Sequence, residues 1–524
     1  MGVRKPKKLK ISASQIKELQ ARIKNRALAE EDWEVVLAMT ETVECLSQAL
    51  AESKTSLARL CKYLLGAPTE TARNIIGKDK PTDTKPKSEK PDRSPPKGHG
   101  RTSAADYKGG ATVLIEHPEL HSGDRCPGCE RGKIYELAMP SVFVHITGAA
   151  PRNATVYERT RLRCNLCGEI FTPPLPPEVG DAKHDASAAA MVAVLKYGCG
   201  MPFHRLEKLQ ENLGQPVPAS TQWDMVQASA LTLTPLLHAL ENAAAQGEVV
   251  HNDDTTARIL SFLKEQDPES TRKGIFTSGI LSIRDGHKIA LFKTGNRHAG
   301  ENLEALLRAR ASGLPPPIQM CDALSRNVPK EFKIILSNCL THGRRQFVEL
   351  MDRFPEECTY VIEALGMVYK NDSIVKERGL SPDVRLAYHQ ENSGPVMDDL
   401  KAWCETQFEQ KLVEPNSGLG KAIKYMLKHW NKLTCFLKMS GAPLDNNVCE
   451  RALKYAILHR KNALFFKTRN GAYVGDLFMS IIHTCQLAGV NPLNYLTWVL
   501  KNIKKLQVNP SDFLPWNYRE DNPG

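Results

Sequence analysis

A stretch between positions 77 and 110 sets the strongest limit on how this chain folds. It reads GKDKPTDTKPKSEKPDRSPPKGHGRTSAADYKGG and holds almost no large apolar side chains. Such a segment buries too little apolar surface to offset the entropy lost on ordering, so we expect a flexible basic linker. The 524 residues therefore fold in separate parts, with an N-terminal region at 1–76 and further domains after the linker.

The charge balance indicates the kind of partner. The chain has 70 Lys and Arg residues against 59 Asp and Glu, a formal net charge of +11, which favours a polyanion such as nucleic acid. No secretion signal and no apolar run of transmembrane length occurs in the sequence. We therefore expect a bacterial cytoplasmic protein, associated with the nucleoid when bound to DNA, whose 14 cysteines are reduced or bind metal.

Residues 30–65 have the pattern of one long helix. Apolar side chains recur every seven residues over four heptads, with a second seam that Ser53 interrupts; the two sets are Val36, Val43, Leu50, Leu57 and Leu64, and Met39, Leu46 and Leu60. This repeat predicts a coiled coil that joins two or more copies of the chain. A long helix packed against its own protein is the alternative.

Two cysteine pairs form the strongest local motif. Cys126-Pro-Gly-Cys129 is followed by Cys164-Asn-Leu-Cys167, with strand-like sequence between them. Two such knuckles place four thiolates for tetrahedral zinc, and four ligands leave no open position for a substrate. We therefore expect a zinc ribbon at 111–180 with a structural zinc ion.

In the remaining chain, the spacing of apolar residues changes twice, from helical to strand-like and back to helical. Residues 181–245 predict three helices, with Ser220 as an N-cap, either a helix-turn-helix-like DNA reader or an ordinary helical subdomain. The runs EVVHNDD, GIFTSGILSIRD, HKIALFKTG, IQMCD and FKIILSN predict strands within 246–344. Residues 345–440 and 441–524 read as helical, so a helical insertion interrupts an α/β unit, and the fold class is multidomain α+β.

Three acids occupy positions that suit metal-dependent phosphodiester chemistry. Asp253 and Asp322 each end a predicted strand, and Glu450 lies near the start of a later helix. Two-metal catalysis needs carboxylates from separated elements that converge on ions about 4 Å apart. An Asp at a strand end is, taken alone, more often a turn or cap residue. The order of the three acids is what a ribonuclease H-like nuclease requires.

Glu450 has a competing interpretation. Asn447 and Glu450 have the spacing of a capping box, in which the carboxylate would bind the backbone at the start of its own helix. In the functional interpretation Glu450 points at the two aspartates. Lys454 and Lys461 then follow on the same helical face, where phosphates pass.

A Cys-x-x-His pair follows the last predicted strand. Cys339 and His342 have the spacing of half a zinc site, but the sequence offers no second pair. We expect a structural or DNA-facing role for the pair. The next residues, Arg344 and Arg345, are expected phosphate contacts.

Several blocks of this sequence resemble the IS66 family of insertion-sequence transposases. They are HNDDTTARIL, NCLTHGRRQF and above all LDNNVCERALKYAILHRKNALFF, together with the paired CxxC knuckles, KYGCGMPFHRLEKL, STQWDM and LPWNY. The resemblance implies a DDE-type enzyme that uses Mg²⁺ or Mn²⁺ and assigns the three acids to Asp253, Asp322 and Glu450. Members usually read Asp-Glu-Thr in the first block, whereas this chain reads Asp253-Asp254-Thr255, so Asp253 is chosen by position.

The resemblance also implies a reaction and its partners. We expect cleavage of double-stranded DNA at the terminal inverted repeats of an insertion sequence and joining to target DNA, by a homodimer or larger oligomer. Small companion proteins of the same element are implied as well. Arg460, in the RKN motif after the DNN-x-x-ER block, joins the candidate DNA contacts. Two alternatives stay open: an inactive DNA-binding protein derived from a transposase, and a ribonuclease H-like nuclease without strand transfer.

Overall fold

The computed structural model describes residues 182–264 and 274–519 without a gap, most of 112–179, and scattered positions between 19 and 37. The predicted coiled coil and linker therefore lie almost entirely outside the described residues. The chain divides into two units, one formed by Met1–Asp83 with Glu356–Gly366 and the other by Thr84–Pro355 with Met367–Gly524. In the first unit, Arg22 forms a 2.9 Å ion pair with Asp32. All candidate site residues lie in the second unit.

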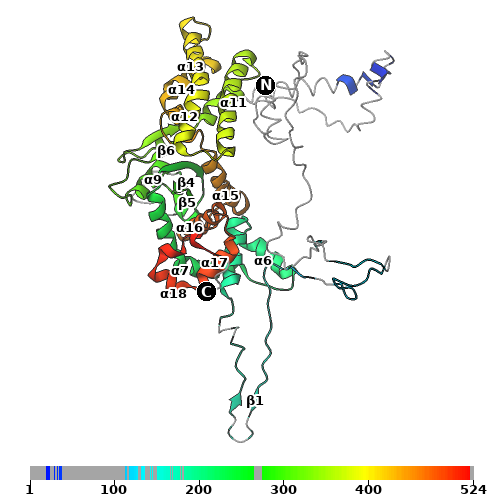
Figure 1. Cartoon of the computed structure of the whole chain (residues 1–524). Coiled ribbons are helices and arrows are strands. Elements are labelled where there is room, and N and C mark those ends of the chain that lie inside the picture. The colour runs from blue at the N-terminus through cyan, green and yellow to red at the C-terminus, as the bar shows by residue number, and fades with distance from the viewer. Residues whose placement is uncertain are drawn as a thin grey trace. The chain divides into compact units, whose positions relative to one another are not determined.

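Five strands form the central sheet among the described residues of the second unit (Figure 1). Its strands are β3 (Val249–Thr256), β4 (Phe276–Arg284), β5 (His287–Gly295), β6 (Ile318–Cys321) and β7 (Ile335–Asn338). The strand order is β5-β4-β3-β6-β7. Strands β3, β4 and β5 pair antiparallel, whereas β6 pairs parallel with β3 and β7 parallel with β6. Each strand lies where alternating or β-branched sequence predicts one, so the strand predictions are confirmed.

The β4–β5 hairpin turns at Asp285-Gly286. Both residues have positive φ, 50° and 79°, as a two-residue turn between twisted antiparallel strands requires. Both the dipeptide and the hairpin are as the sequence predicts.

Helices pack on this sheet and on one another. They are α5 (Ala186–Ala193), the π-helix η2 (Val194–Gly198), α6 (Phe203–Asn212), α7 (Ala219–Ala245), α8 (Leu260–Lys264), α9 (Ala299–Leu307), α10 (Leu340–Val348), α15 (Asn447–Ala463), α16 (Arg469–Leu487), α17 (Pro492–Lys501) and α18 (Ile503–Val508). Helix α7 begins at Ala219 after Pro218, so the predicted N-cap at Ser220 is wrong by two residues. Proline is tolerated at a helix start because its missing N–H costs no helical hydrogen bond there.

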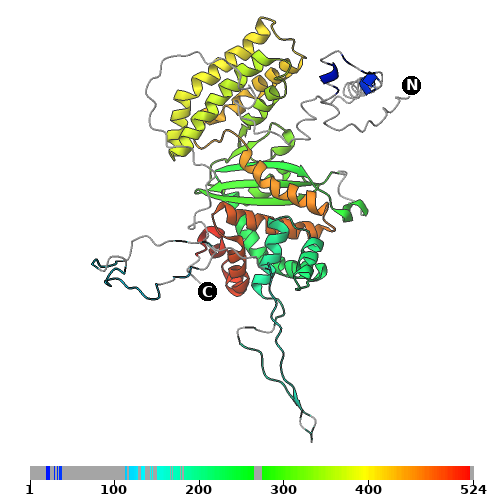
Figure 2. The same ribbon diagram turned by 90° about the vertical axis from the view of Figure 1, so that its right-hand side faces the viewer.

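Helix α7 belongs to the main hydrophobic core. Val226, Leu233 and Leu240 are fully buried and cluster with the apolar residues of α16 and of the sheet. Figure 2 shows α15 lying across the sheet, where it packs on β3 and β4. The sheet therefore carries α15 on one face and α7 and α9 on the other, with the core between the layers.

Helix α16 covers the outer edge of the sheet at β5. Thr484, Ser480 and Asp476 accept the backbone N–H groups of alternate β5 residues, Ala290, Phe292 and Thr294, at 2.6–3.1 Å. Four helical residues rise about 6.0 Å and two strand residues about 6.6 Å, so the two spacings match. This polar stripe satisfies donors that an edge strand otherwise exposes for pairing with another chain.

Residues between β7 and α15 are mostly helical, as predicted for 345–440. The helices are α11 (Pro355–Glu377), α12 (Pro382–Asn392), α13 (Gly394–Glu409) and α14 (Gly418–Leu433). Helix α14 is amphipathic: it buries Leu419, Ile423 and Met426 and exposes a stripe of lysines. It packs on α10, α13 and β7, which places it next to the end of the sheet where Asp322 lies.

The cysteine-rich region holds two short antiparallel pairings. Arg125 bridges Lys133 around the first CxxC pair, and β1 (Leu162–Arg163) pairs with β2 (Ile170–Phe171) around the second. Cys126 and Cys167 are described as free thiols, whereas Cys129 and Cys164 lie outside the described residues. Cys126 therefore lies next to the Arg125–Lys133 pairing, and Cys167 lies between β1 and β2.

Candidate active site

Asp253 and Asp322 lie side by side at one end of the sheet. The parallel register of β3 and β6 pairs His251 with Met320, and each aspartate lies two residues beyond its member of that pair. Since both strands run the same way, their carboxyl ends meet at one edge and the two side chains share one site. The pairing of β3 with β6 thus brings together residues about seventy positions apart in the chain.

Asn327 connects the two aspartates. It is fully buried at the end of the short helix η3 (Ser325–Asn327). Its side-chain amide donates to Asp253 Oδ1 at 3.4 Å and to Asp322 Oδ1. Its backbone carbonyl accepts from Asn252 at 2.7 Å and Gln319 at 2.6 Å. Asn327 is therefore held on both sides and fixes the spacing of the carboxylates.

The electrostatics of Asp253 differ from those of an ordinary aspartate. Burial raises its pKa to about 6, opposed by the backbone N–H of Asp254 and reinforced by the negative charges of Asp322 and Glu450. Asp322 and Glu450 thus lie close enough to Asp253 for their charges to act on it. A group of carboxylates that is costly to ionise together is stabilised by a cation.

Asp254 has a different role from its neighbour. Successive residues of a strand point to opposite faces, and the Asp254 carboxylate accepts from Ser278 at 2.6 Å and from His298 and the Ala299 N–H at 3.0 Å. Its side chain is 1% exposed. With these donors in place, Asp254 anchors the start of α9 on the sheet, away from Asp253.

Glu450 lies in the first turn of α15, and the capping-box interpretation is wrong. The helix begins at Asn447, its N-cap is Asn446, and no side chain caps it. The Glu450 atom Oε1 is shielded from solvent without a hydrogen-bond partner in the described structure, and it lies 3.9 Å from His342 Nδ1. The carboxylate therefore projects into the site and does not bind its own backbone.

Asn446 places the start of α15. It is fully buried, its side chain bonds His251 Nδ1 at 3.1 Å and donates to the Asn252 carbonyl at 3.1 Å, and its backbone N–H donates to Cys339 Sγ at 3.3 Å. Burial lowers the pKa of His251 to about 4, so its ring is neutral. Because the Asn446 side chain is hydrogen-bonded to His251 and Asn252 of β3, it does not cap α15.

Gly279 lets α15 approach the sheet. It pairs with Asp253 across β3 and β4, and an added Cβ would meet the Leu453 side chain at 2.9 Å. The Cys449 thiol also donates to the Gly279 carbonyl at 3.4 Å. The glycine thus brings the first turn of α15, which carries Glu450, directly against the strand that carries Asp253.

Basic side chains border the acids. One hollow beside Asp322 is lined by Arg345, His342 and Tyr425. A second, of about 510 Å³, extends from Asp322 to Lys428, His429 and Lys432 of α14 together with Lys330. This juxtaposition of acids and cations suits a cation-dependent reaction on a polyanion.

The predicted DNA contacts lie in different environments. Lys454 and Lys461 are exposed on α15. Arg460 donates to Thr255 Oγ1 at 3.2 Å and to Thr256, which ties α15 to the end of β3. Arg344 is 7% exposed, so its side chain is part of the protein interior.

Comparison with known proteins identifies the family. Residues 183–474, more than half of the chain, match the model described as "Transposase IS66 family". The chain belongs to the IS66 family of transposases. The matched span includes Asp253, Asp322 and Glu450, so membership of this family places the three acids in a DNA-processing enzyme.

Three uncharacterized proteins of Sinorhizobium fredii (strain NBRC 101917 / NGR234) are similar to this transposase-family chain. The protein y4jD is 26% identical over 517 residues, 93% of this chain and 98% of its own. The protein y4hP is 26% identical over 427 residues, 78% of this chain and 75% of its own. The protein y4qI is 25% identical over 345 residues, 63% of this chain and 62% of its own. Their names state no activity.

Sequence reasoning missed Asn327, Gly279 and Asn446 as determinants of the site. Asn446 stands in the DNN block that carries the family resemblance, so that block was the available signal. Asn327 and Gly279 have no motif, and their roles depend on contacts between segments far apart in the chain.

Within the described part of this transposase, no helix has the length and apolar character needed to span a bilayer.

Proposed function

We propose that this IS66-family protein is a DDE transposase that cleaves DNA at insertion-sequence ends and transfers the freed strand. The observation that carries the proposal is the convergence of three carboxylates, from β3, from the residue after β6 and from α15. Burial raises the pKa of Asp253, and the charges of Asp322 and Glu450 raise it further. Neighbouring carboxylates are costly to ionise together, and a bound cation offsets that cost.

The three acids fit Mg²⁺ or Mn²⁺. Carboxylate oxygens are the hard donors that these ions prefer, and Asp253, Asp322 and Glu450 would hold them. When bound, the ions activate a water or a 3′-hydroxyl nucleophile and stabilise the leaving oxygen of the phosphodiester. Asn327 holds Asp253 and Asp322 at a fixed spacing, and Asn446 fixes the start of the helix that carries Glu450.

The cations around the site support DNA as the substrate. Arg345 lines one hollow beside Asp322, Lys428 and Lys432 line the other, and Lys454 and Lys461 extend the positive surface along α15. We assign phosphate contacts to these side chains. Arg344 is left out because it is buried, and Arg460 acts as a positioning residue for α15 through the threonines of β3.

The fold supports the same proposal. Three antiparallel strands followed by two parallel ones, with the first strand central, agree with a ribonuclease H-like core built from 246–344 and 441–524 and interrupted by the helical insertion. We assign residues 111–180 to a zinc ribbon held by Cys126, Cys129, Cys164 and Cys167, and residues 1–76 to dimerisation. Residues 181–245 supply core helices, and α7 buries one of its faces against the rest of the protein.

The partners follow from the reaction. We propose double-stranded DNA, both the terminal inverted repeats and the target, and a homodimer or larger oligomer that holds two ends together. Companion proteins of the same element are part of this proposal.

A strand-transfer assay tests the function. Purified protein, the element's terminal DNA and Mn²⁺ are expected to give joined products. Glu450→Gln, Asp253→Asn and Asp322→Asn are expected to lose roughly 10³-fold in rate, about 4 kcal/mol of transition-state stabilisation, while binding DNA normally. Asp254→Asn serves as the control for a neighbouring acid outside the site. It is expected to lower stability through α9 and to leave the rate per folded molecule within a few fold.

Three other outcomes would contradict parts of the proposal. Cleavage that survives in Glu450→Gln would remove this residue from the site. Cut DNA without joined product would indicate a nuclease. End binding without any product, even with the companion proteins added, would indicate an inactive DNA-binding protein.

A further inference from the structure

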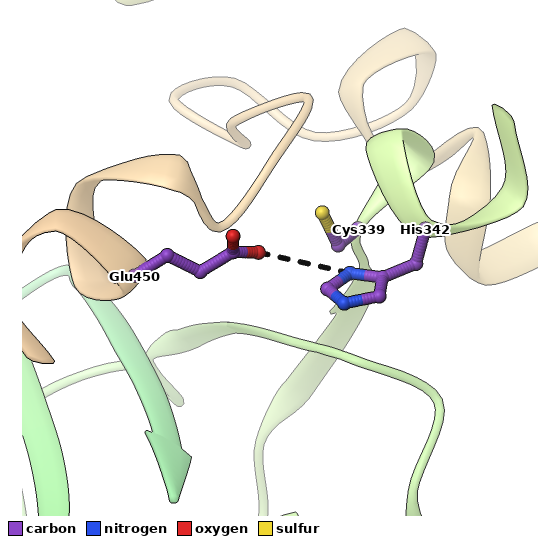
Figure 3. A group of neighbouring side chains, drawn as sticks. All are labelled: Cys339, His342 and Glu450. Carbon is purple, nitrogen blue, oxygen red and sulfur yellow. Dashed lines mark ion pairs between the residues drawn. The ribbon is translucent and has the colours of Figure 1, made fainter. Parts of the chain in front are cut away.

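Cys339, His342 and Glu450 form a second cluster of metal-binding side chains beside the three acids. Cys339 is the N-cap of α10, His342 lies in the first turn of that helix, and Glu450 comes from α15. One ligand atom from each lies within 4.8 Å of the other two. Figure 3 shows the Glu450 carboxylate and the His342 ring facing each other, with the Cys339 sulfur next to the ring.

Two of these atoms lack a hydrogen-bond partner. His342 Nδ1 and Glu450 Oε1 are both shielded from solvent and make no hydrogen bond in the described structure. Their 3.9 Å separation is too long for a hydrogen bond between them. Buried polar atoms that remain unpaired are costly, so a small ligand between them would remove that cost.

The spacing suits one ion. With bonds of about 2.0–2.3 Å, two ligands of a tetrahedral zinc ion lie roughly 3.3–3.8 Å apart. The three ligand atoms lie within 4.8 Å of one another, so side-chain movements of about 1 Å would bring them into that range. The Cys339 sulfur accepts the Asn446 N–H, a bond that becomes stronger when the sulfur is a thiolate.

The donor set differs from that of the three acids. A thiolate and an imidazole favour borderline-soft Zn²⁺, whereas the acids offer only oxygen, which suits Mg²⁺ or Mn²⁺. Three protein ligands also leave a fourth position open for water or phosphate. Glu450 is common to both sets, so the two ions compete for one carboxylate.

We propose that Cys339, His342 and Glu450 bind Zn²⁺, and that zinc bound there inhibits the enzyme by withdrawing Glu450 from Asp253 and Asp322. The binding half of this proposal concerns the protein alone. The inhibitory half rests on the proposed transposase function.

The binding half is tested without DNA, on the full-length protein. Purified apoprotein is titrated with Co²⁺ and Zn²⁺ while the thiolate-to-cobalt charge-transfer absorption is recorded. The CxxC cysteines contribute equally in all variants, so the difference between proteins reports the new site. Cys339→Ser is expected to bind one equivalent fewer than wild type and to show weaker absorption. Cys485→Ser, an equally buried cysteine of α16, is the matched control and is expected to behave as wild type.

Equal stoichiometry and absorption in Cys339→Ser and wild type would overturn the site. If Cys339→Ser fails to fold, judged by its melting curve, His342→Gln replaces it and is expected to lose the same equivalent. The imidazole is partly exposed, so this second change removes a ligand without emptying a core position.

The inhibitory half is tested in the strand-transfer assay with Mn²⁺ and increasing Zn²⁺. Each protein is normalised to its own zinc-free rate. We expect inhibition of wild type that excess Mn²⁺ relieves, and at least a tenfold higher inhibitory zinc concentration for Cys339→Ser. Equal inhibition of both proteins, with binding lost only in the variant, would overturn the inhibitory half. If no protein cleaves DNA, the transposase proposal fails, and the titration alone decides the zinc site.

Discussion

At the scale of single residues, Asn327 determines how closely Asp253 and Asp322 approach. One amide bridges both carboxylates, and the backbone of the same residue is held by Asn252 and Gln319. In the proposed metal site, Asn327 orients the ligands without binding the ions, and such residues tune ion affinity.

Asn327→Ala is therefore expected to weaken Mn²⁺ activation by about 10–100-fold. The rate at saturating Mn²⁺ is expected to stay near wild type, because the ligands themselves are intact. The measurement is the strand-transfer rate as a function of Mn²⁺ concentration. A fall in the saturating rate with unchanged Mn²⁺ dependence would contradict a positioning role.

Much of the candidate site can be predicted from the sequence. The rest depends on contacts between elements far apart in the chain, which the sequence does not reveal. Asp253 and Asp322 stand at strand ends, and Glu450 stands in a family block, so pattern and resemblance find them. The choice between Asp253 and Asp254 depends on strand alternation and on α9, which the structure supplies. The partners of Asn327 and Asn446 lie on other elements, and no local spacing encodes them.

At the scale of elements, the contact between α15 and β4 sets the position of Glu450. Gly279 leaves room for Leu453, and a methyl group there would collide at 2.9 Å. Since α15 is also held through Asn446, the helix has little freedom to move aside.

Gly279→Ala is expected to lower the free energy of unfolding by about 1–3 kcal/mol through overpacking and to reduce strand transfer by displacing Glu450. Denaturant unfolding and the transfer assay measure the two effects. Gly313→Ala is the matched control, because a Cβ there meets nothing within 4 Å. A stable, fully active Gly279→Ala protein would show that α15 is not seated as described.

Asp476 makes the attachment of α16 to β5 dependent on pH. Burial raises its pKa to about 7, although hydrogen bonds from Thr294 and the charge of Lys293 act in the opposite direction. Between the ordinary aspartate pKa near 4 and about 7, the folded protein keeps a proton that the unfolded chain releases. The unfolded state then binds fewer protons, so stability falls as pH rises through this window.

Unfolding by denaturant at pH 5 and pH 7 checks this prediction. The contribution of Asp476 is expected to decrease with a slope of at most about 1.4 kcal/mol per pH unit. Asp476→Asn, which keeps an acceptor for the Thr294 N–H, is expected to show a flatter dependence than wild type. Identical slopes for the two proteins would refute the raised pKa.

The sequence predicts the strands of the central sheet better than the side-chain contacts that surround them. All five lie where β-branched runs occur, because period and turn residues are local signals. The stripe of Asp476, Ser480 and Thr484 is invisible in advance: in a helix these residues look like ordinary polar positions, and only the pairing with an edge strand explains their burial.

At the scale of the whole molecule, charge is distributed to suit the proposed substrate. The exposed stripe of α14 consists of Lys421, Lys424, Lys428 and Lys432, and its last two lysines line the hollow that opens at Asp322. The helical insertion, which the sequence predicts only as helical, thus adds cations directly beside the acids.

Lys428→Gln combined with Lys432→Gln is expected to weaken DNA binding and to reduce the salt slope of the association constant by about 2, one for each lost phosphate contact. Affinity measured across a series of salt concentrations gives that slope. Lys504→Gln with Lys505→Gln removes the same charge from exposed positions of α18 and is the control. Equal losses in both pairs would indicate a general charge effect.

The insertion between Asp322 and Glu450 also determines when the site is completed during synthesis. The two residues are 128 positions apart (450 minus 322), so a ribosome adding about 5–20 residues per second needs roughly 6–25 s to pass from one to the other. Throughout that interval, the nascent chain carries both aspartates without the glutamate. Under the proposed function, a chain released early by a nonsense codon or a broken messenger within this stretch ends without Glu450 and holds only two of the three proposed metal ligands.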